Sequence, residues 1–132
     1  MDLDETLIHF EESQNGGQYL LRPFCEEFIS KMSRYFEIIV FTAAVKEYAD
    51  WILDKIDPNK LISHWLYWNN TTVQNGVYLK DLNKLGRELS KVIIIDNNPE
   101  NFLLHPQNGI FIKSWYNDPN DKALRELSNV LE

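Results

Sequence analysis

The sequence predicts a single α/β domain with a Rossmann-like architecture, in which helices cover a central parallel sheet to give three layers. Two observations support this fold class. Short unbroken apolar runs, Ile38–Phe41 and Val92–Ile95, are rich in β-branched residues and resemble strands that are buried on both faces. Segments with helical periodicity lie before, between and after these runs, and such alternation is typical of α/β folds.

Hydrophobic periodicity predicts four helices around the two strands. One of them covers Val45–Ile56, where Tyr48 and Ile52 lie on one apolar face. The pair Asp57-Pro58 ends this helix, because a residue that precedes proline avoids the helical conformation. The other predicted elements are helices over Phe24–Tyr35, Asp81–Leu89 and Asp121–Leu131, and a strand over Ile110–Ile112.

The length and charge of the chain limit the classes of protein to which it can belong. Its 132 residues, 44% of them hydrophobic, are expected to form one domain over residues 1–132. The net charge of −7 and the lack of Lys and Arg clusters argue against nucleic-acid binding. No apolar run reaches the roughly 20 residues that span a bilayer. The single cysteine cannot form an internal disulfide, which favours the nucleus or the cytoplasm, while anchoring through a segment outside this sequence stays open.

The first strand of the predicted sheet is expected to be truncated. Asp2 suits the carboxyl end of a strand, and a strand that ends there needs about four apolar residues before it. Only Met1 precedes Asp2 in the sequence. We therefore expect an incomplete strand immediately before the most acidic part of the candidate site.

Polar residues follow three of the expected strands, at the ends where open α/β sheets bind their ligands. Asp2 and Asp4 come first, then Thr42, then Asp96 and Asn97. Asp2 and Asp4 are two residues apart, so their side chains point the same way in an extended segment. Carboxylates this close repel each other unless a cation lies between them, and an oxygen-rich site of this kind suits Mg²⁺. One aspartate could then attack phosphorus while the other transfers protons.

Motifs spread over nearly the whole chain identify a family resemblance. The most specific are the first run, Asp2-Leu3-Asp4-Glu5-Thr6-Leu7, and the motifs around Lys80 and Asp96. With the others, they resemble the haloacid-dehalogenase-type (HAD) phosphatases of the small C-terminal-domain phosphatase family, which includes NLI-interacting-factor-like and Dullard-type enzymes. The resemblance implies a HAD-like fold without a large cap domain. The remaining motifs are Arg22-Pro23, Val40-Phe41-Thr42-Ala43, Tyr78-Leu79-Lys80-Asp81-Leu82, Ile95-Asp96-Asn97-Asn98-Pro99, His105-Pro106 and Ile112-Lys113-Ser114-Trp115.

The resemblance implies a role for each matching residue. Asp2 is the expected nucleophile, which forms an aspartyl-phosphate, and Asp4 is the expected general acid and base. Thr42 and Lys80 are expected to bind the transferring phosphoryl group. Mg²⁺ is the expected cofactor, bound by Asp2, by the backbone carbonyl of Asp4 and by Asn97. The other expected site residues are Ala43 and Trp68, which contact the substrate, and Asp96, which orients the site.

The sequence departs from the family pattern at three places. The segment Trp68–Thr71 stands where relatives carry an Arg-x-x-Cys-like segment, so Trp68 takes the position of an arginine. The segment Phe10–Leu21 is shorter than in relatives that carry an insertion there. Asn98 replaces a common Ser or Thr. Of these, the change at Trp68 bears most directly on the affinity for a phosphoprotein.

The resemblance implies a protein phosphatase that acts on phosphoserine or phosphothreonine, for example in the tail of RNA polymerase II or in a signalling protein. A catalytically weak or inactive scaffold, like the mitochondrial import-receptor relatives, remains an alternative. The intact Asp2 and Asp4 argue against that scaffold, while Trp68 favours it. A small-molecule phosphatase of the wider superfamily is a second alternative, although the chain has no room for the cap domain that such enzymes usually carry.

Cys25 could suggest the different chemistry of a cysteine-dependent phosphatase. Those enzymes bind phosphate in a Cys-x₅-Arg loop, whereas the sixth residue after Cys25 is Lys31. Both residues lie in a predicted amphipathic helix that contains no glycine. We therefore expect Cys25 to be a core residue without a catalytic role.

Overall fold

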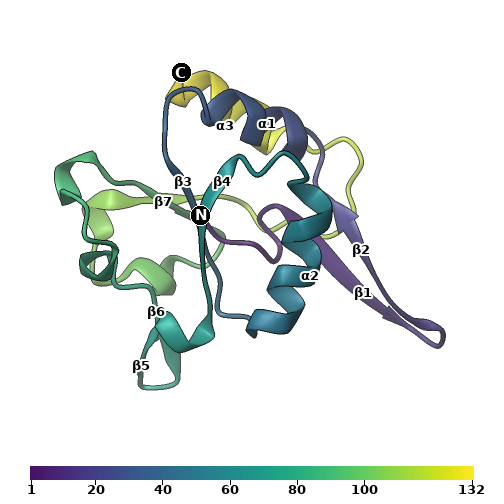
Figure 1. The fold of residues 1–132 in the computed structure, drawn as a ribbon, viewed down its shortest axis with the longest axis horizontal. Coiled ribbons are helices and arrows are strands. Elements are labelled where there is room, and N and C mark those ends of the chain that lie inside the picture. Colours follow the sequence, from purple (N-terminus) through teal and green to yellow (C-terminus); the bar gives the residue numbers. More distant parts are fainter.

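The computed structural model describes residues 1–132 as a mixed α/β fold without a cap domain (Figure 1). It has three α-helices and four pairs of hydrogen-bonded strands. No helix has both the length and the apolar character needed to cross a membrane. The helices are α1 (Cys25–Met32), α2 (Lys46–Ile56) and α3 (Ala123–Leu131); the strands are β1 (Ile8–Ser13), β2 (Gly16–Leu21), β3 (Ile38–Phe41), β4 (Ile62–Leu66), β5 (Thr72–Gln74), β6 (Val77–Leu79), β7 (Ile94–Asp96) and β8 (Gly109–Phe111).

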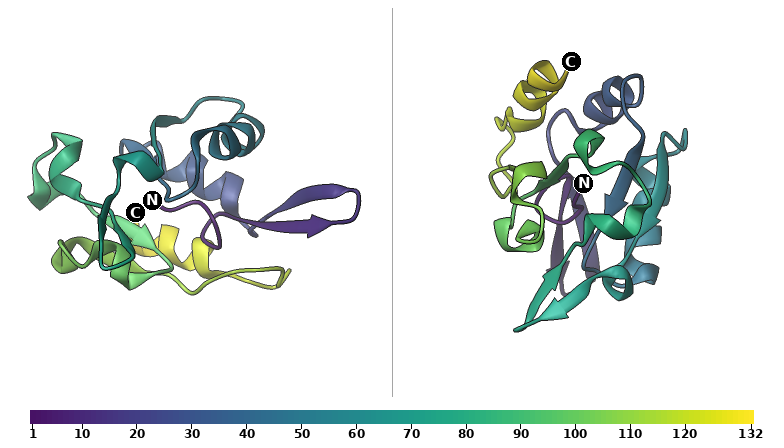
Figure 2. Two further views of the ribbon diagram at one scale, coloured as in Figure 1. Left: turned by 90° about the horizontal axis from the view of Figure 1, so that it is seen from below. Right: turned by 90° about the vertical axis from the view of Figure 1, so that its left-hand side faces the viewer.

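Two parallel strand pairs, β3–β4 and β7–β8, are joined through the first residues of the chain. The backbone nitrogen of Phe41 donates to the carbonyl of Met1 at 2.9 Å, and that of Asp2 donates to the carbonyl of Ile95 at 3.0 Å. Met1 and Asp2 therefore occupy a strand position between β3 and β7, and Figure 2 shows the amino terminus near the middle of the molecule. The expected parallel arrangement is confirmed, with Asp2 at its centre.

An apolar cavity of about 270 Å³ lies beside Met1, between the two parallel pairs. Phe28 and Met32 of α1 contribute to its lining, as do Ile38 of β3 and Ile94 of β7. None of the polar residues singled out in the sequence lines this cavity. The polar residues lie instead at the carboxyl ends of β3 and β7.

The core of the molecule collects residues from all three helices and from both parallel pairs. Ile52 and Leu53 of α2 and Val40 of β3 are completely buried. Leu3 and Leu7 are also completely buried, and they lie on either side of Asp4 in the sequence. Burial of a leucine side chain contributes about 1.5–3 kcal/mol, so these two residues anchor the acidic loop to the core.

The prediction of a helix over Asp81–Leu89 is wrong. The chain there forms two short 3-10 turns, Leu82–Leu85 and Leu89–Lys91. Gly86 lies between them with φ +68°, a left-handed conformation that ends helices and that glycine adopts without steric cost. Apolar spacing alone suggested a helix, but the glycine interrupts it.

The other predicted elements exist with shifted ends. The helix expected over Phe24–Tyr35 is shorter, because Phe24 adopts φ +68° and precedes the first helical residue. The strand expected over Val92–Ile95 begins only at Ile94, and Ile93 is 42% exposed. The strand expected over Ile110–Ile112 is displaced by one residue, and the helix expected from Asp121 begins two residues later.

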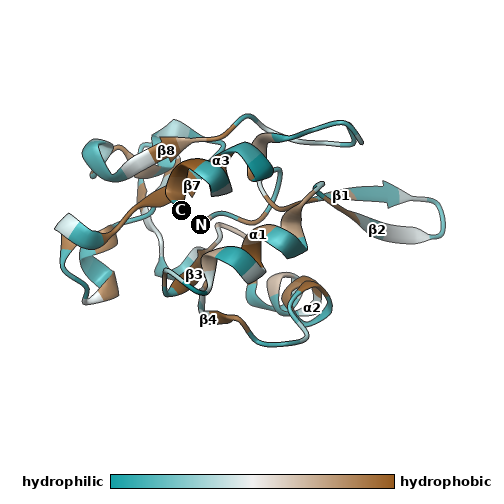
Figure 3. Ribbon diagram, turned by 90° about the horizontal axis from the view of Figure 1, so that it is seen from above, coloured by the Kyte–Doolittle hydropathy of each residue, from teal (hydrophilic) through white to brown (hydrophobic).

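Two antiparallel hairpins, β1–β2 and β5–β6, were not predicted from the sequence. Each contains an Asn-Gly pair at its turn, Asn15-Gly16 and Asn75-Gly76, which is the strongest short-range signal of a β-hairpin. The β1–β2 hairpin projects from the body of the molecule (Figure 1), and its residues are mostly hydrophilic to neutral (Figure 3). The hairpin contains the segment Phe10–Leu21 that the sequence marks as short.

Arg22 connects the acidic loop to the beginning of α3. Its side chain is completely buried, and its Nη1 donates to the carbonyl of Thr6 at 3.1 Å. Its Nε and Nη2 donate to the two carboxylate oxygens of Asp121 at 2.8 and 3.1 Å. A two-bond pair of this kind fixes orientation as well as distance. Arg22 therefore ties the segment that follows Asp4 to the residues before α3.

We predict that Asp121→Asn destabilises the protein at neutral pH and makes its stability less sensitive to acid. Burial alone would raise the pKa of Asp121, but the hydrogen bonds and charge of Arg22 outweigh it and lower the pKa below the usual 3.8. The stabilisation is therefore present above pH 3.8 and is lost as the pH falls through the lower value in the folded protein. Breaking a buried pair costs roughly 3 kcal/mol.

Urea unfolding between pH 7 and pH 3 measures this effect. The difference between the wild type and Asp121→Asn should be largest at pH 7 and should shrink at the acidic end. Asp118→Asn is the matched control, because the side chain of Asp118 accepts only a local hydrogen bond from the backbone nitrogen of Asn120. A difference that stays constant over the whole pH range would contradict the role of the Arg22–Asp121 pair.

Candidate active site

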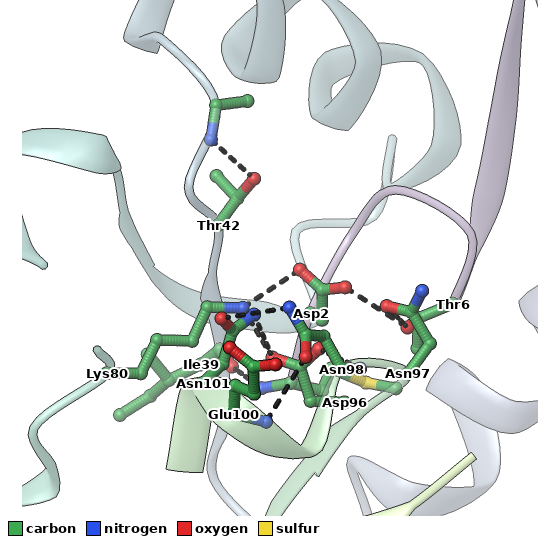
Figure 4. Close-up of polar contacts among 12 residues, drawn as sticks. Asp2, Thr6, Ile39, Thr42, Lys80, Asp96, Asn97, Asn98, Glu100 and Asn101 are labelled. Atoms are coloured by element: carbon green, nitrogen blue, oxygen red, sulfur yellow. Dashed lines mark hydrogen bonds and ion pairs between the residues drawn. The ribbon is translucent and has the colours of Figure 1, made fainter. Parts of the chain in front are cut away.

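A buried ion triad forms the centre of the candidate site. The Nζ of Lys80 lies 2.9 Å from Oδ1 of Asp2 and 2.6 Å from Oδ2 of Asp96. The side chains of Lys80 and Asp96 are completely buried, and that of Asp2 is 10% exposed. Lys80 follows β6, Asp96 ends β7, and Asp2 occupies the central strand position (Figure 4). Three segments that are distant in the sequence thus place their charges together.

The triad carries two carboxylates and only one ammonium group. Burial favours the neutral form of Lys80, but the charges of Asp2 and Asp96 outweigh it and raise the pKa of Lys80 above its usual value. The pKa of Asp2 is also raised, because burial and the charge of Asp96 outweigh the attraction of Lys80. The two carboxylates thus raise the pKa of Lys80, while burial and the charge of Asp96 raise that of Asp2. A cation beside Asp2 would offset that excess.

Asp96 is held by the loop that follows β7. Its Oδ1 accepts from the backbone nitrogen of Asn98 at 3.0 Å, and its Oδ2 accepts from Nδ2 of Asn101 at 3.2 Å. The carbonyl of Asn101 in turn accepts from the backbone nitrogen of Lys80 at 2.8 Å. The same loop therefore fixes both the main chain of Lys80 and the carboxylate that binds its side chain. Sequence reasoning did not identify Asn101, because a lone asparagine carries no distinguishing signal.

The hydroxyl group of Thr6 lies between Asp2 and Asn97. Its Oγ1 is 3.2 Å from Oδ2 of Asp2 and 3.3 Å from Oδ1 of Asn97. The amide nitrogen of Asn97 donates to Oγ of Ser114 at 2.9 Å, which turns its oxygen toward Thr6. Two oxygen acceptors from segments that are distant in the sequence therefore converge on one hydroxyl group. Thr6 and Ser114 belong to the sequence motifs, but sequence reasoning gave them no role.

Asp4 lies in a separate set of contacts. Its Oδ1 accepts a hydrogen bond from Oη of Tyr48 at 2.5 Å, and it does not bind Lys80. Burial raises the pKa of Asp4, and the hydrogen bond from Tyr48 only partly opposes this effect. The two aspartates of the first motif thus have different partners and different surroundings. Such a division suits two carboxyl groups with different chemical tasks.

The loop between the two aspartates and β1 contains a strained residue. Glu5 has φ +59°, which is unusual for a residue other than glycine. Its backbone nitrogen donates to Ile8 at 2.7 Å, and its carbonyl accepts from Trp115 at 2.9 Å. Its carboxylate lies 3.0 Å from Nδ1 of His9. These contacts hold the turn that follows Asp4 and leads into β1.

Thr42, Ala43 and Trp68 lie outside the triad of Lys80, Asp2 and Asp96. Thr42 is buried at the end of β3, and its Oγ1 accepts from the backbone nitrogen of Ala44 at 3.0 Å, so its own proton remains available (Figure 4). Ala43 is exposed, and Trp68 is 49% exposed. The backbone nitrogen of Trp68 donates to the carbonyl of Ala44 at 3.0 Å. This bond places Trp68 beside the loop that begins with Thr42.

The oxygen atoms of Asp2 and Asn97 are the side-chain groups that could hold a metal ion. No three side chains of His, Cys, Asp or Glu are arranged as a metal site on their own. Mg²⁺ prefers one or two carboxylates supplemented by water and substrate phosphate, so it does not need such a cluster. The set of oxygen donors on Asp2 and Asn97 therefore fits a magnesium ion.

Cys25 has no place in this chemistry. It is buried in α1 and forms no disulfide. Burial raises the pKa of its thiol to about 12, so the reactive thiolate is scarce at neutral pH. The expectation that Cys25 is a core residue is confirmed.

The sequence matches curated proteins over its whole length. It is 44% identical to CTD small phosphatase-like protein 2 of Dictyostelium discoideum, of which it spans 26%. It is 36% identical to phosphatase PSR1 of Saccharomyces cerevisiae and 37% identical to a human CTD small phosphatase-like protein, of which it spans 35% and 54%. The chain thus spans about a quarter to a half of the curated relatives it matches. Each alignment extends over 148 positions against 132 residues here, so the alignments contain gaps.

The fold also matches solved structures. The fission yeast RNA polymerase II CTD phosphatase Fcp1, bound to beryllium fluoride, is similar over 98% of this chain and 48% of its own, with a TM-score of 0.72 and 21% identity. A second Fcp1 structure gives the same TM-score at 22% identity. These likenesses show that the chain shares the fold of Fcp1, in agreement with the α/β fold class that the sequence predicts. The model of the NLI interacting factor-like phosphatases matches residues 1–132. The chain belongs to the NLI interacting factor-like phosphatase family.

Proposed function

We propose that this chain is a magnesium-dependent protein phosphatase that hydrolyses phosphoserine and phosphothreonine through an aspartyl-phosphate on Asp2. The observation that carries the proposal is the completely buried Lys80, bonded to both Asp2 and Asp96. Burying a lysine is costly unless its charge is paired. A structure that keeps this group beside a carboxylate nucleophile suits the binding of a phosphoryl group.

In this proposal Asp2 attacks the phosphorus atom and displaces the oxygen of serine or threonine. In the transition state, negative charge is spread over the three oxygens of the transferring phosphoryl group. Lys80 neutralises part of that charge. Thr42 donates the proton of its hydroxyl group to one of those oxygens. Asp96 binds Lys80 and keeps its ammonium group directed toward Asp2.

Asp4 serves as the general acid in the first step and as the general base in the second. It protonates the departing oxygen and later takes a proton from the water that attacks the aspartyl-phosphate. Burial raises the pKa of Asp4, a direction that favours the protonated form that a general acid needs. The separation of Asp4 from Lys80 supports the role too, since an adjacent ammonium would favour the ionised form.

Asp2, Asn97 and the backbone carbonyl of Asp4 would hold the magnesium ion. When bound, Mg²⁺ supplies positive charge that offsets the two carboxylates and the phosphate. Thr6 keeps the oxygens of Asp2 and Asn97 on the same side. The net negative charge of the buried triad is what favours a cation at this point.

The proposed substrate is a phosphoprotein. Relatives of this chain are described as CTD small phosphatases, and the tail of RNA polymerase II or a signalling protein would offer phosphoserine in an extended segment. The net charge of −7 suits a substrate that carries basic residues near its phosphate. The lack of a cap domain leaves the site open to a polypeptide, whereas small-molecule phosphatases of this class usually close over their substrates.

An inactive scaffold is the competing function. Trp68, where an arginine is expected, is the observation that favours it. A scaffold would have no use for a buried lysine between two carboxylates, which costs stability without a catalytic return. Direct measurement of phosphatase activity separates the two functions.

We predict that the protein releases phosphate from p-nitrophenyl phosphate with Mg²⁺, and that Asp2→Asn lowers kcat at least roughly 10³-fold, because the amide cannot act as the nucleophile. Measurement of p-nitrophenolate release under saturating substrate tests this. Asp54→Asn, an exposed aspartate of α2, is the matched control. Equal rates for the wild type and Asp2→Asn would exclude the enzyme function.

Removal of the metal is expected to abolish activity reversibly. Dialysis against EDTA should reduce the rate to the level of Asp2→Asn, and added Mg²⁺ should restore it, because the triad has an excess of negative charge without a cation. Full activity after dialysis, with metal analysis showing no residual ion, would contradict the assignment of Mg²⁺.

Lys80→Met is expected to lower kcat by about 10²–10³-fold, since it removes one donor to the phosphoryl group. It should also destabilise the protein at pH 7, because Asp2 and Asp96 then stay buried without a partner. Acidification should restore part of this stability as the carboxylates take up protons. Urea unfolding at pH 7 and pH 5 measures the effect, with Lys91→Met as an exposed control. Unchanged activity of Lys80→Met would contradict the proposed role of Lys80 in binding the phosphoryl group.

A further inference from the structure

We propose that Tyr48 is a positioning residue that fixes the carboxyl group of Asp4 for proton transfer to the leaving group. The inference rests on the proposed function, in which Asp4 is the general acid and base. Tyr48 belongs to the first turn of α2, 44 residues after Asp4 in the sequence. Sequence reasoning placed it on the apolar face of that helix.

The contact between Tyr48 and Asp4 leaves one carboxyl oxygen for chemistry. Oη of Tyr48 donates to Oδ1 of Asp4 at 2.5 Å, and no other side chain or backbone nitrogen bonds the Asp4 carboxyl group. Burial and the hydrogen bond to Asp4 raise the pKa of the Tyr48 phenol above its usual value, so the hydroxyl group remains a donor at neutral pH. Oδ1 is therefore occupied, and Oδ2 is the atom that carries the transferred proton.

The ring of Tyr48 is fixed from two sides. Phe10 of β1 packs against it edge to face, with the ring centroids 5.5 Å apart. Gly17 of β2 lies behind Phe10, where a Cβ atom would come within 1.9 Å of the Phe10 ring. Ala49, the next residue of α2, is completely buried and anchors the helix in the core. The hairpin and the helix thus define where the hydroxyl group points.

The hydrogen bond between Tyr48 and Asp4 bears on both proton transfers of the reaction. In the first half-reaction the bond between phosphorus and the serine oxygen breaks, a bond from Asp2 to phosphorus forms, and the proton on Oδ2 of Asp4 passes to the serine oxygen. In the second, water attacks phosphorus, returns its proton to Oδ2, and Asp2 leaves as a carboxylate. Tyr48 keeps its own proton in both steps and holds Asp4 in the orientation that both require.

This role predicts a dependence on the leaving group. A serine alkoxide leaves only with a proton, whereas p-nitrophenolate is a weak base and leaves without one. Tyr48→Phe should lower kcat/KM for a phosphoserine peptide by about 10- to 100-fold, because misplacement of a general acid costs much of its contribution. For p-nitrophenyl phosphate the loss should be less than about threefold. The parameter kcat/KM is chosen because it reports the step in which the leaving group departs.

Tyr67→Phe provides a matched control. Oη of Tyr67 donates to a carboxylate oxygen of Asp50, which lies on α2 like Tyr48. Tyr67 forms no hydrogen bond with Asp4. It should change kcat/KM for the two substrates by the same factor. In an Asp4→Asn background, Tyr48→Phe should have no further effect on the ratio of the two substrates, since the acid that it positions is absent.

The outcomes separate this inference from the proposed function. Equal losses on both substrates, or no loss on either, would overturn the positioning role while the enzyme remains active. Failure of the proposed function appears separately, as activity that Asp2→Asn does not reduce. The contact itself is tested without activity by the NMR shift of the Asp4 carboxyl carbon, which Tyr48→Phe should change and Tyr67→Phe should not. An unchanged shift in Tyr48→Phe overturns the inference.

Discussion

The pairing of one buried ammonium group with two buried carboxylates is the constraint on which the site depends. Lys80 is completely buried, so its charge is tolerated only while Asp2 and Asp96 stay within hydrogen-bond distance. That requirement ties together the central strand position, the end of β7 and the segment after β6. The loop after β7 reinforces it through Asn98 and Asn101. The charges of the candidate site and the local structure therefore depend on the same contacts.

Around this triad the molecule divides its polar groups between two environments. Asp2 faces Lys80 and Thr6, whereas Asp4 faces Tyr48. The strained turn at Glu5 follows Asp4, and the buried Leu3 and Leu7 anchor this segment in the core. Two aspartates that are adjacent in a motif thus acquire different surroundings. Such separate surroundings suit the proposed roles, in which one carboxyl group is the nucleophile and the other transfers protons.

Sequence patterns located the parts of the fold that follow simple rules. Continuous β-branched runs identified β3 and β7, and the apolar stripe through Ile52 identified α2. The predicted helix near Lys80 failed because Gly86 adopts a left-handed conformation that outweighs apolar spacing. The two hairpins were missed although their Asn-Gly turns were visible, since their strands are short and only partly apolar.

By itself, the sequence determined the family and the fold class and predicted the main residues of the candidate site, because short motifs in a fixed order carry that information. It could not determine which partner each residue has. Lys80, read alone, resembles a surface lysine, and Tyr48 resembles a core aromatic residue. Only the tertiary structure decided that Lys80 is buried between two carboxylates and that Tyr48 bonds Asp4. The physical reason is that these contacts join residues 44 and 78 positions apart, and chain folding alone sets such distances.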